Sequence, residues 1–209
     1  MSTLRTISGF KSALAGGGAR PNLFEVSIDS FPDSISNVWG NELRKEFKFL
    51  CKASNIPAST VGSIDVPFRG RIFKVAGDRT IDNWSITVIN DENFDIRTAF
   101  ETWHNHIVKL DNNSGATNPT EYMVDAKVYQ LGRGYGSKME SKKNDKSGSN
   151  GDEVSPLRTY KFIDIWPVSV SDIALSYDTG DSIEEFTVEF AVQNIEIGSN
   201  KDQNKTMVK

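Results

Sequence analysis

The stretch SYDTGDSIEEFTVEFAV, from Ser176 to Val192, combines clustered acidic residues with a regular apolar alternation. In its second half every second residue is apolar, at Phe186, Val188, Phe190 and Val192. The positions between them are Glu185, Thr187, Glu189 and Ala191. Because successive side chains of a β-strand point to opposite faces, the pattern predicts a strand with one core face and one polar face.

The carboxylates of this stretch have three candidate roles: a metal site, an acid/base pair, or the solvated face of a strand. Glu185 and Glu189 lie four residues apart on the predicted strand, which separates them by about 13 Å, too far for a paired-carboxylate active site. Asp178, Gly180 and Asp181 are typical of a hairpin turn. A calcium site in that turn is disfavoured because the stretch lacks the alternating Asp/Asn loop of an EF-hand. We therefore interpret the acids as a turn followed by an exposed acidic strand face.

Period-2 alternation recurs through much of the chain. It predicts further strands within 22–29, 46–51, 63–77, 81–90, 121–130 and 159–177. The 46–51 segment is expected to place Phe47, Phe49 and Cys51 on one face. The 63–77 segment is interpreted as a hairpin that turns at Arg69-Gly70, with Pro67 confined to an edge or a bulge. The 159–177 segment is interpreted as two strands broken near Trp166-Pro167.

One segment departs from this alternation and predicts a helix. Within 91–110, the apolar residues Ile96, Phe100, Trp103 and Ile107 are spaced by four, three and four, which matches one face of an α-helix. Asp91 or Asn93 can cap its start. The sequence therefore predicts a mostly β fold, a barrel or sandwich of antiparallel strands with one flanking α-helix. Its predicted core includes Trp84, Phe100, Trp103, Phe186 and Phe190.

Length and composition indicate one globular domain with loose extensions. The chain has 209 residues, a net charge of -4 and 37% hydrophobic residues. Residues 1–21 are expected to form a flexible N-terminal arm, 22–197 the β-barrel domain, and 198–209 a flexible tail. Within the domain, 134–155 is rich in Gly, Ser and Lys and is expected to be a mobile loop insertion. Apolar runs are short, so no membrane span is expected.

The sequence patterns that could indicate catalysis or cofactor binding are weak. His104 and His106 lie about 200° apart on a helix, so they cannot share one metal ion. The G-x-G-x-G run at 132–136 is not a dinucleotide or phosphate-loop motif and is followed by a polar loop. Cys51 is expected to be a buried structural thiol. We therefore expect no cofactor, no metal and no enzymatic activity.

Three segments together resemble the tail tube proteins of contractile-tailed bacteriophages. They are LCKASNIPASTVGSIDVPFRGRIFKVAGDRT at 50–80, NWSITVINDENFDIRTAFETWHNHI at 83–107, and DIWPVSVSDIALSYDTGDSIEEFTVEFAVQ at 164–193. The resemblance covers about 20–197 and extends to tube subunits of type VI secretion systems and contractile bacteriocins. The Lys/Ser-rich loop at 137–153 has no place in the family pattern.

The resemblance implies a structural protein of the phage tail in the virion, assembled in the cytoplasm of the host bacterium. Such subunits form six-membered rings that stack into a hollow tube inside a contractile sheath, and genomic DNA is ejected through the tube. The implied partners are further copies of the chain, the sheath protein, tube-initiating baseplate and tail terminator proteins, and a length-measuring protein in the lumen. DNA would pass through without specific binding.

Within that resemblance, two sets of residues become candidate functional sites. Glu185 and Glu189 are candidates for an acidic lumen lining, because an acidic wall repels the DNA backbone and a basic wall binds it. The candidate contact region between rings or subunits comprises Ile56, Pro57, Val61, Ile64, Phe68, Arg69 and Arg71. Two alternatives stay open: the tube of a phage-derived contractile injection particle, and, in another class, a β-sandwich binding module that is monomeric.

Overall fold

The computed structural model describes residues 6–14, 18–132, 156–178 and 180–199. The predicted insertion at 134–155 and most of the predicted C-terminal tail lie outside these ranges. The chain divides into two compact units. The larger unit comprises 26–127 and 161–196, and the smaller one comprises 1–25, 128–160 and 197–209.

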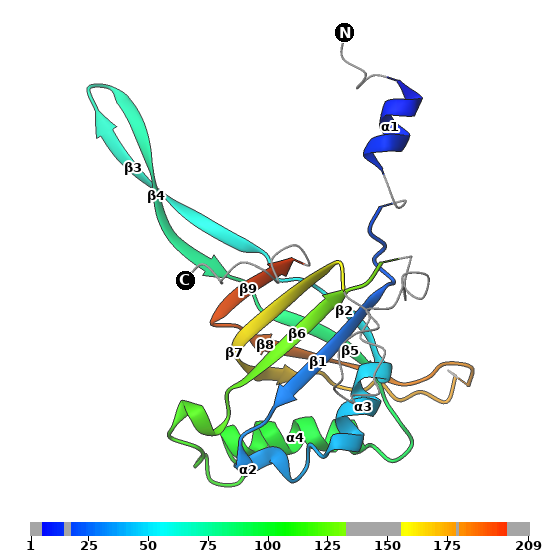
Figure 1. The fold of residues 1–209 in the computed structure, drawn as a ribbon. Coiled ribbons are helices and arrows are strands. Elements are labelled where there is room, and N and C mark those ends of the chain that lie inside the picture. The colour runs from blue at the N-terminus through cyan, green and yellow to red at the C-terminus, as the bar shows by residue number, and fades with distance from the viewer. Residues whose placement is uncertain (1–5, 15–17, 133–155, 179, 200–209) are drawn as a thin grey trace, which may run out of the picture. The chain divides into compact units, whose positions relative to one another are not determined.

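A seven-stranded sheet forms the framework, and a separate two-stranded sheet accompanies it (Figure 1). The large sheet has the order β1-β6-β7-β8-β5-β2, with β9 paired to β7. Its strands are β1 (Phe24–Ser30), β2 (Cys51–Ser54), β5 (Trp84–Ile89), β6 (Val124–Gln130), β7 (Arg158–Val170), β8 (Glu185–Ala191) and β9 (Asn194–Ser199). The pairs β2/β5, β5/β8 and β7/β8 are antiparallel. The predicted mostly β, antiparallel fold is confirmed.

The helix predicted within 91–110 is α4 (Asp95–Ile107), which buries Ile96, Ala99, Phe100 and Trp103. In the larger unit it is accompanied by the short α2 (Asp33–Ser36), by α3 (Asn41–Leu50) and by the 3₁₀ turn η3 (Pro119–Glu121). Phe94 precedes α4 in the left-handed region, with φ of 59° and no side-chain cap. Asp91 is not the N-cap residue, but its Oδ2 accepts a hydrogen bond from the N–H of Asp95, the first residue of α4, at 3.4 Å.

Aromatic side chains fill the core between α4 and the sheet of the larger unit. The rings of Trp84 and Phe190 stack with centroids 5.0 Å apart, and Phe100 meets Phe186 and Phe190 at 6.2 and 5.9 Å. The indole N–H of Trp103 donates to the Tyr122 carbonyl at 2.8 Å, so its polar group is satisfied inside the core. All five residues predicted for the core are at most 1% exposed.

The strand predicted at 46–51 is wrong over most of its length, because 41–50 forms α3 and only Cys51 begins a strand. Phe47 is 1% exposed and Phe49 is 86% exposed, which places the two rings on opposite sides of the helix. Residues two apart on a helix are turned by about 200° relative to each other. The better signal was the spacing of four and three from Leu43 through Phe47 to Leu50, of which Phe47 is buried and the other two are half-buried.

The break predicted near Trp166-Pro167 is also wrong. β7 continues through both residues, and the disturbance is only a register shift against β8 between Pro167 and Ser169. Proline has no N–H for the ladder, so the pairing slips at this point while the strand goes on. Residues 171–177 then lie in a connecting loop, where the sequence had indicated a second strand.

Of the smaller unit, the structure describes 6–14, 18–25, 128–132, 156–160 and 197–199. Residues 7–13 of the expected flexible arm form the short helix α1 (Ile7–Ala13), whose first turn is capped by Thr6 Oγ1 accepting from the Gly9 N–H at 3.2 Å. The Gln130 side chain donates to the carbonyls of Arg20 and Leu23, both at 2.8 Å. These bonds tie the segment before β1 to the end of β6.

Candidate assembly surfaces

The hairpin predicted at 63–77 is present and longer than expected. It consists of β3 (Ser59–Phe68) and β4 (Arg71–Ile81), which form the separate two-stranded sheet. The turn residues Arg69 and Gly70 have φ of 46° and 80°. Two successive positive φ values are typical of the tight turns that match strand twist, and glycine adopts them at low cost. Pro67 sits in this two-stranded sheet, which has only edge strands.

One face of the hairpin is mostly apolar between the pair Ile64↔Val75 and the turn. Paired residues of two strands share a face, and the pairs Ile64↔Val75, Val66↔Phe73 and Phe68↔Arg71 alternate with Asp65↔Lys74 and Pro67↔Ile72. The first set places five apolar side chains together, each 42–66% exposed: Ile64, Val66, Phe68, Phe73 and Val75. We call this set the hairpin face. A two-stranded hairpin with neither face covered is marginally stable in water, so the hairpin face is suited to contact with a partner.

The predicted contact residues fall mostly on this hairpin. Val61, Ile64 and Phe68 are exposed on β3, and Arg69 and Arg71 flank its tip. Ile56 precedes the hairpin and is 46% exposed, but Pro57 is buried. The structure therefore makes all of these side chains available except that of Pro57.

The two predicted lumen candidates lie on the face of β8 that points away from the aromatic core. Glu185 forms an ion pair with Lys52, which follows the start of β2. Thr187 lies between the two glutamates and its hydroxyl is 3.5 Å from that of Thr87 on the neighbouring strand. Glu189 is exposed, pairs with Ser85 across the strands, and enters none of the ion pairs described for the larger unit. The negative charge of Glu185 is thus offset by Lys52, whereas Glu189 enters no ion pair among the residues that the structure describes.

A second ion pair lies elsewhere on the sheet. Lys161 Nζ on β7 is 2.8 Å from Asp125 Oδ2 on β6. The hydrogen bond that Lys161 donates to Asp125 raises the pKa of Lys161, more than partial burial lowers it. The polar surface of the sheet therefore carries charges of both signs.

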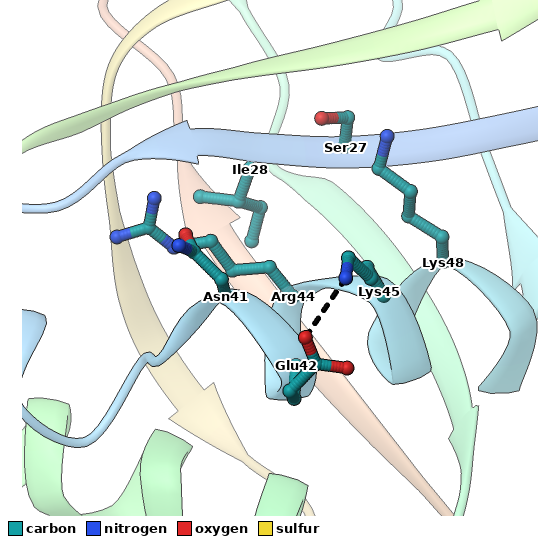
Figure 2. A pocket seen from close by; sticks show the side chains of 7 residues that line it. All are labelled: Ser27, Ile28, Asn41, Glu42, Arg44, Lys45 and Lys48. Carbon is teal, nitrogen blue, oxygen red and sulfur yellow. Dashed lines mark hydrogen bonds and ion pairs between the residues drawn. The ribbon is translucent and has the colours of Figure 1, made fainter. Parts of the chain in front are cut away.

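The surface hollow between β1 and α3 is lined mainly by basic and polar side chains (Figure 2). Arg44, Lys45 and Lys48 line it from α3, with Glu42 paired to Lys45 at 2.8 Å. Its lining contains one carboxylate and one serine, and neither histidine nor cysteine.

Other candidate chemical groups are isolated. Burial raises the pKa of the Cys51 thiol to about 12, which keeps it protonated and unreactive. His104 and His106 both lie on α4. In the described parts of the chain, no cluster of three or more His, Cys, Asp or Glu side chains could hold a metal ion. No helix within the same ranges has the length and apolar character needed to cross a membrane.

Sequence reasoning missed one exposed surface, the loop 171–184 between β7 and β8. Leu175, Tyr177 and Ile183 are 80%, 108% and 71% exposed. Leu175 and Tyr177 belong to the alternating pattern within 159–177 that suggested a strand, although alternation alone cannot distinguish a half-buried strand from an exposed loop. The loop also contains Asp178 and Asp181, and turns lie at both of these residues.

Comparisons with known proteins agree with this architecture. The chain is 33% identical to the tail tube protein gp19 of Enterobacteria phage T4 over 178 residues, which is 85% of this chain and 91% of that protein. It is 26% identical to the tail tube protein of Serratia phage KSP90, covering 88% and 92% of the two chains. The fold resembles that of a chain in the sheath/tube terminator structure of an extracellular contractile injection system (TM-score 0.54, 12% identity), with coverage of 87% and 97%. A family model described as phage tail tube protein matches residues 19–196. The chain therefore belongs to the phage tail tube protein family.

Proposed function

We propose that this tail tube protein assembles into six-membered rings, which stack into a hollow tube through which DNA is ejected. The observation that carries the proposal is the uncovered hairpin face, with five apolar side chains each at least 42% exposed. Burying apolar surface contributes about 25 cal/mol per Å², so such a face favours association with another chain. A cyclic arrangement of copies gives each exposed surface a partner without leaving free ends in the ring.

The edges of the large sheet support the same proposal. β1 and β2 stand at the two ends of the strand order, and each therefore has one side with no partner strand in that sheet. Unpaired strand edges are templates for pairing with another chain. We infer that these edges are joined or covered when neighbouring subunits meet in a ring.

The lumen assignment of Glu185 and Glu189 follows from the same proposal. DNA carries about one negative charge per 1.7 Å of its axis, and a wall rich in free basic groups binds it through counterion release. Glu189 supplies a negative charge outside the described ion pairs, while Lys52 offsets Glu185. We therefore assign the larger share of any repulsion to Glu189. A tube reconstruction that places Glu189 anywhere other than the lumen overturns this assignment.

The remaining features are proposed from the family as a whole. The partners are the sheath protein, the tube-initiating baseplate protein, the tail terminator and a length-measuring protein, and assembly takes place in the host cytoplasm. The role is structural and not enzymatic. We propose 22–197 as the tube domain, with 1–21 as an arm that orders on assembly, 134–155 as a mobile insertion and 198–209 as a flexible tail.

Negative-stain electron microscopy of the purified full-length chain tests the proposal directly. The expected result is six-fold rings or long hollow tubes, more abundant at higher protein concentration. Analytical ultracentrifugation of the same samples provides the control for nonspecific aggregation, since rings sediment as discrete species. A chain that stays monomeric at high concentration, unchanged by time or salt, refutes ring formation and favours a monomeric β-sandwich binding module.

A further inference from the structure

The loop 171–184, which the structure describes at 171–178 and 180–184, is anchored at both ends. At its start, the Ser171 carbonyl accepts from Arg97 Nη1 at 2.7 Å, and the Ser171 hydroxyl accepts from the Thr187 N–H at 3.0 Å. At its end, Asn90 donates its backbone N–H to the Glu184 carbonyl at 2.9 Å and its side-chain amide to the Glu184 carboxylate at 3.1 Å. The loop therefore leaves a fixed base, and its described residues 174–178 and 180–183 are exposed.

The exposed part of this loop is both apolar and acidic. Its apolar side chains are Leu175, Tyr177 and Ile183, all at least 71% exposed. The whole loop contains three aspartates and one glutamate and no lysine or arginine. Asp172, Asp178 and Asp181 are exposed and take part in none of the ion pairs that the structure describes. Exposed apolar side chains accompanied by one sign of charge favour a partner that is apolar and oppositely charged.

The tip of the hairpin has that complementary character. From Val66 to Phe73 the chain reads VPFRGRIF, with two arginines and no acid. Phe68, Ile72 and Phe73 are 64–66% exposed. Asp65, the nearest acid in the chain, is already paired with Lys74 at 2.8 Å, so it does not neutralise the arginines. Arg69 lies over the ring of Phe68, 5.5 Å from its centroid.

We propose that the hairpin tip, Val66–Phe73, of one copy docks on the loop 171–184 of a second copy. Phe68 and Phe73, which share the hairpin face, would cover Leu175, Tyr177 and Ile183, and Arg69 and Arg71 would face the loop aspartates. The inference rests on the self-assembly proposed above and names the surface that receives the hairpin.

The two surfaces differ from each other, so the contact is heterologous. Each copy offers one hairpin tip and one acidic loop, and each can therefore receive one copy and dock on another. Contacts of this kind repeat head to tail until they close into a ring or continue along an axis. A stacked tube contains contacts within each ring and contacts between rings along its axis. The docking contact would provide one of these two kinds.

Site-specific cross-linking locates the contact. Chains carrying Phe68→Cys and tagged chains carrying Leu175→Cys are mixed under assembly conditions and treated with a short bismaleimide. The native thiol of Cys51 is buried, so it contributes little background. The matched control is Leu110→Cys, because Leu110 is also an exposed leucine, at 94%. We expect about tenfold more heterodimer with Leu175→Cys than with Leu110→Cys, the ratio that 1.4 kcal/mol of preference produces.

Charge reversal tests whether the electrostatic match matters. Arg69→Glu/Arg71→Glu and Asp178→Arg/Asp181→Arg are each expected to raise the concentration needed for assembly by about tenfold or more, because each change places like charges opposite each other across the interface. The chain that carries all four changes is expected to assemble nearly as well as the original, since the sign of each partner is reversed together. If each double variant impairs assembly and the chain with all four changes does not recover it, the proposed electrostatic match is overturned.

The outcomes separate the docking contact from the proposed function. Tubes with the 68–175 cross-link support both proposals. Tubes without it, or with equal cross-linking to Leu110→Cys, overturn the docking contact and leave the tube intact. The specific cross-link in small oligomers, with neither rings nor tubes, supports the docking contact and overturns the tube. Monomers without the cross-link overturn both.

Discussion

Replacing Phe190 with alanine removes the ring that joins the sheet to α4. Phe190 is 0% exposed, stacks on Trp84 at 5.0 Å, and contacts Phe100 and Trp103, with centroids 5.9 Å apart in both cases. Three large aromatic rings surround the site, so the cavity cannot close by a small side-chain shift. We expect Phe190→Ala to lower the free energy of unfolding by about 3–5 kcal/mol, the range for buried phenylalanine.

The matched control is the preceding residue. Glu189 points to the opposite face of β8 and is exposed, so Glu189→Gln should change the free energy of unfolding by no more than about 0.5 kcal/mol. Urea denaturation followed by tryptophan fluorescence measures both variants, at a concentration where the chain is monomeric, because association adds to apparent stability. A loss below about 1 kcal/mol for Phe190→Ala, or a larger loss for Glu189→Gln, refutes the assignment of the two faces.

Three further predictions follow from single groups. Cys51, with its pKa raised to about 12, should react with a disulfide reagent at pH 8 far more slowly in the folded chain than in urea; equal rates contradict its burial. Asp125→Asn should lower the pKa of Lys161. The native pair stabilises the fold fully below the unfolded lysine pKa of about 10.4, and this effect is lost as the pH rises through the raised pKa of Lys161 in the folded chain. The original chain should therefore be more stable than Asp125→Asn at pH 9, and the two should converge at higher pH. Denaturation series at several pH values measure this difference. Gly70→Val should strain the turn at φ of 80° and reduce assembly in light scattering, while the urea midpoint of the monomer stays nearly unchanged.

Most of the sheet could be predicted because its strands are half buried. The alternation at Trp84–Ile89, Val124–Gln130 and Glu185–Ala191 corresponds to buried positions on every second residue. The Arg69-Gly70 turn was equally clear, since few residues tolerate two successive positive φ values. In these segments local preference and tertiary burial agree, and the sequence is informative for that reason.

The errors occurred where one apolar pattern fits two structures. Phe47, Phe49 and Cys51 alternate as in a strand, yet α3 buries only Phe47 of the two phenylalanines, because helical spacing with Leu43 and Leu50 competes with the alternation. Pro167 was interpreted as a break, although a register shift is enough to accommodate a missing N–H. No local pattern could show that Glu185 meets Lys52, because those residues are brought together by pairing across β5.

The distribution of charge connects the proposed assembly with the proposed conduit. The exposed arginines at the hairpin tip would bind a polyanion if they stayed exposed in the tube, since arginine is well suited to phosphate. Docking on loop 171–184 would cover Arg69 and Arg71 with aspartates of a second copy, so assembly would neutralise the positive charge of the hairpin tip. Glu189 lies on β8, outside both docking surfaces, so this contact does not offset its charge. The same contact that holds copies together would therefore leave the assembled wall less attractive to DNA than the isolated chain, and a conduit that must release its cargo requires that difference.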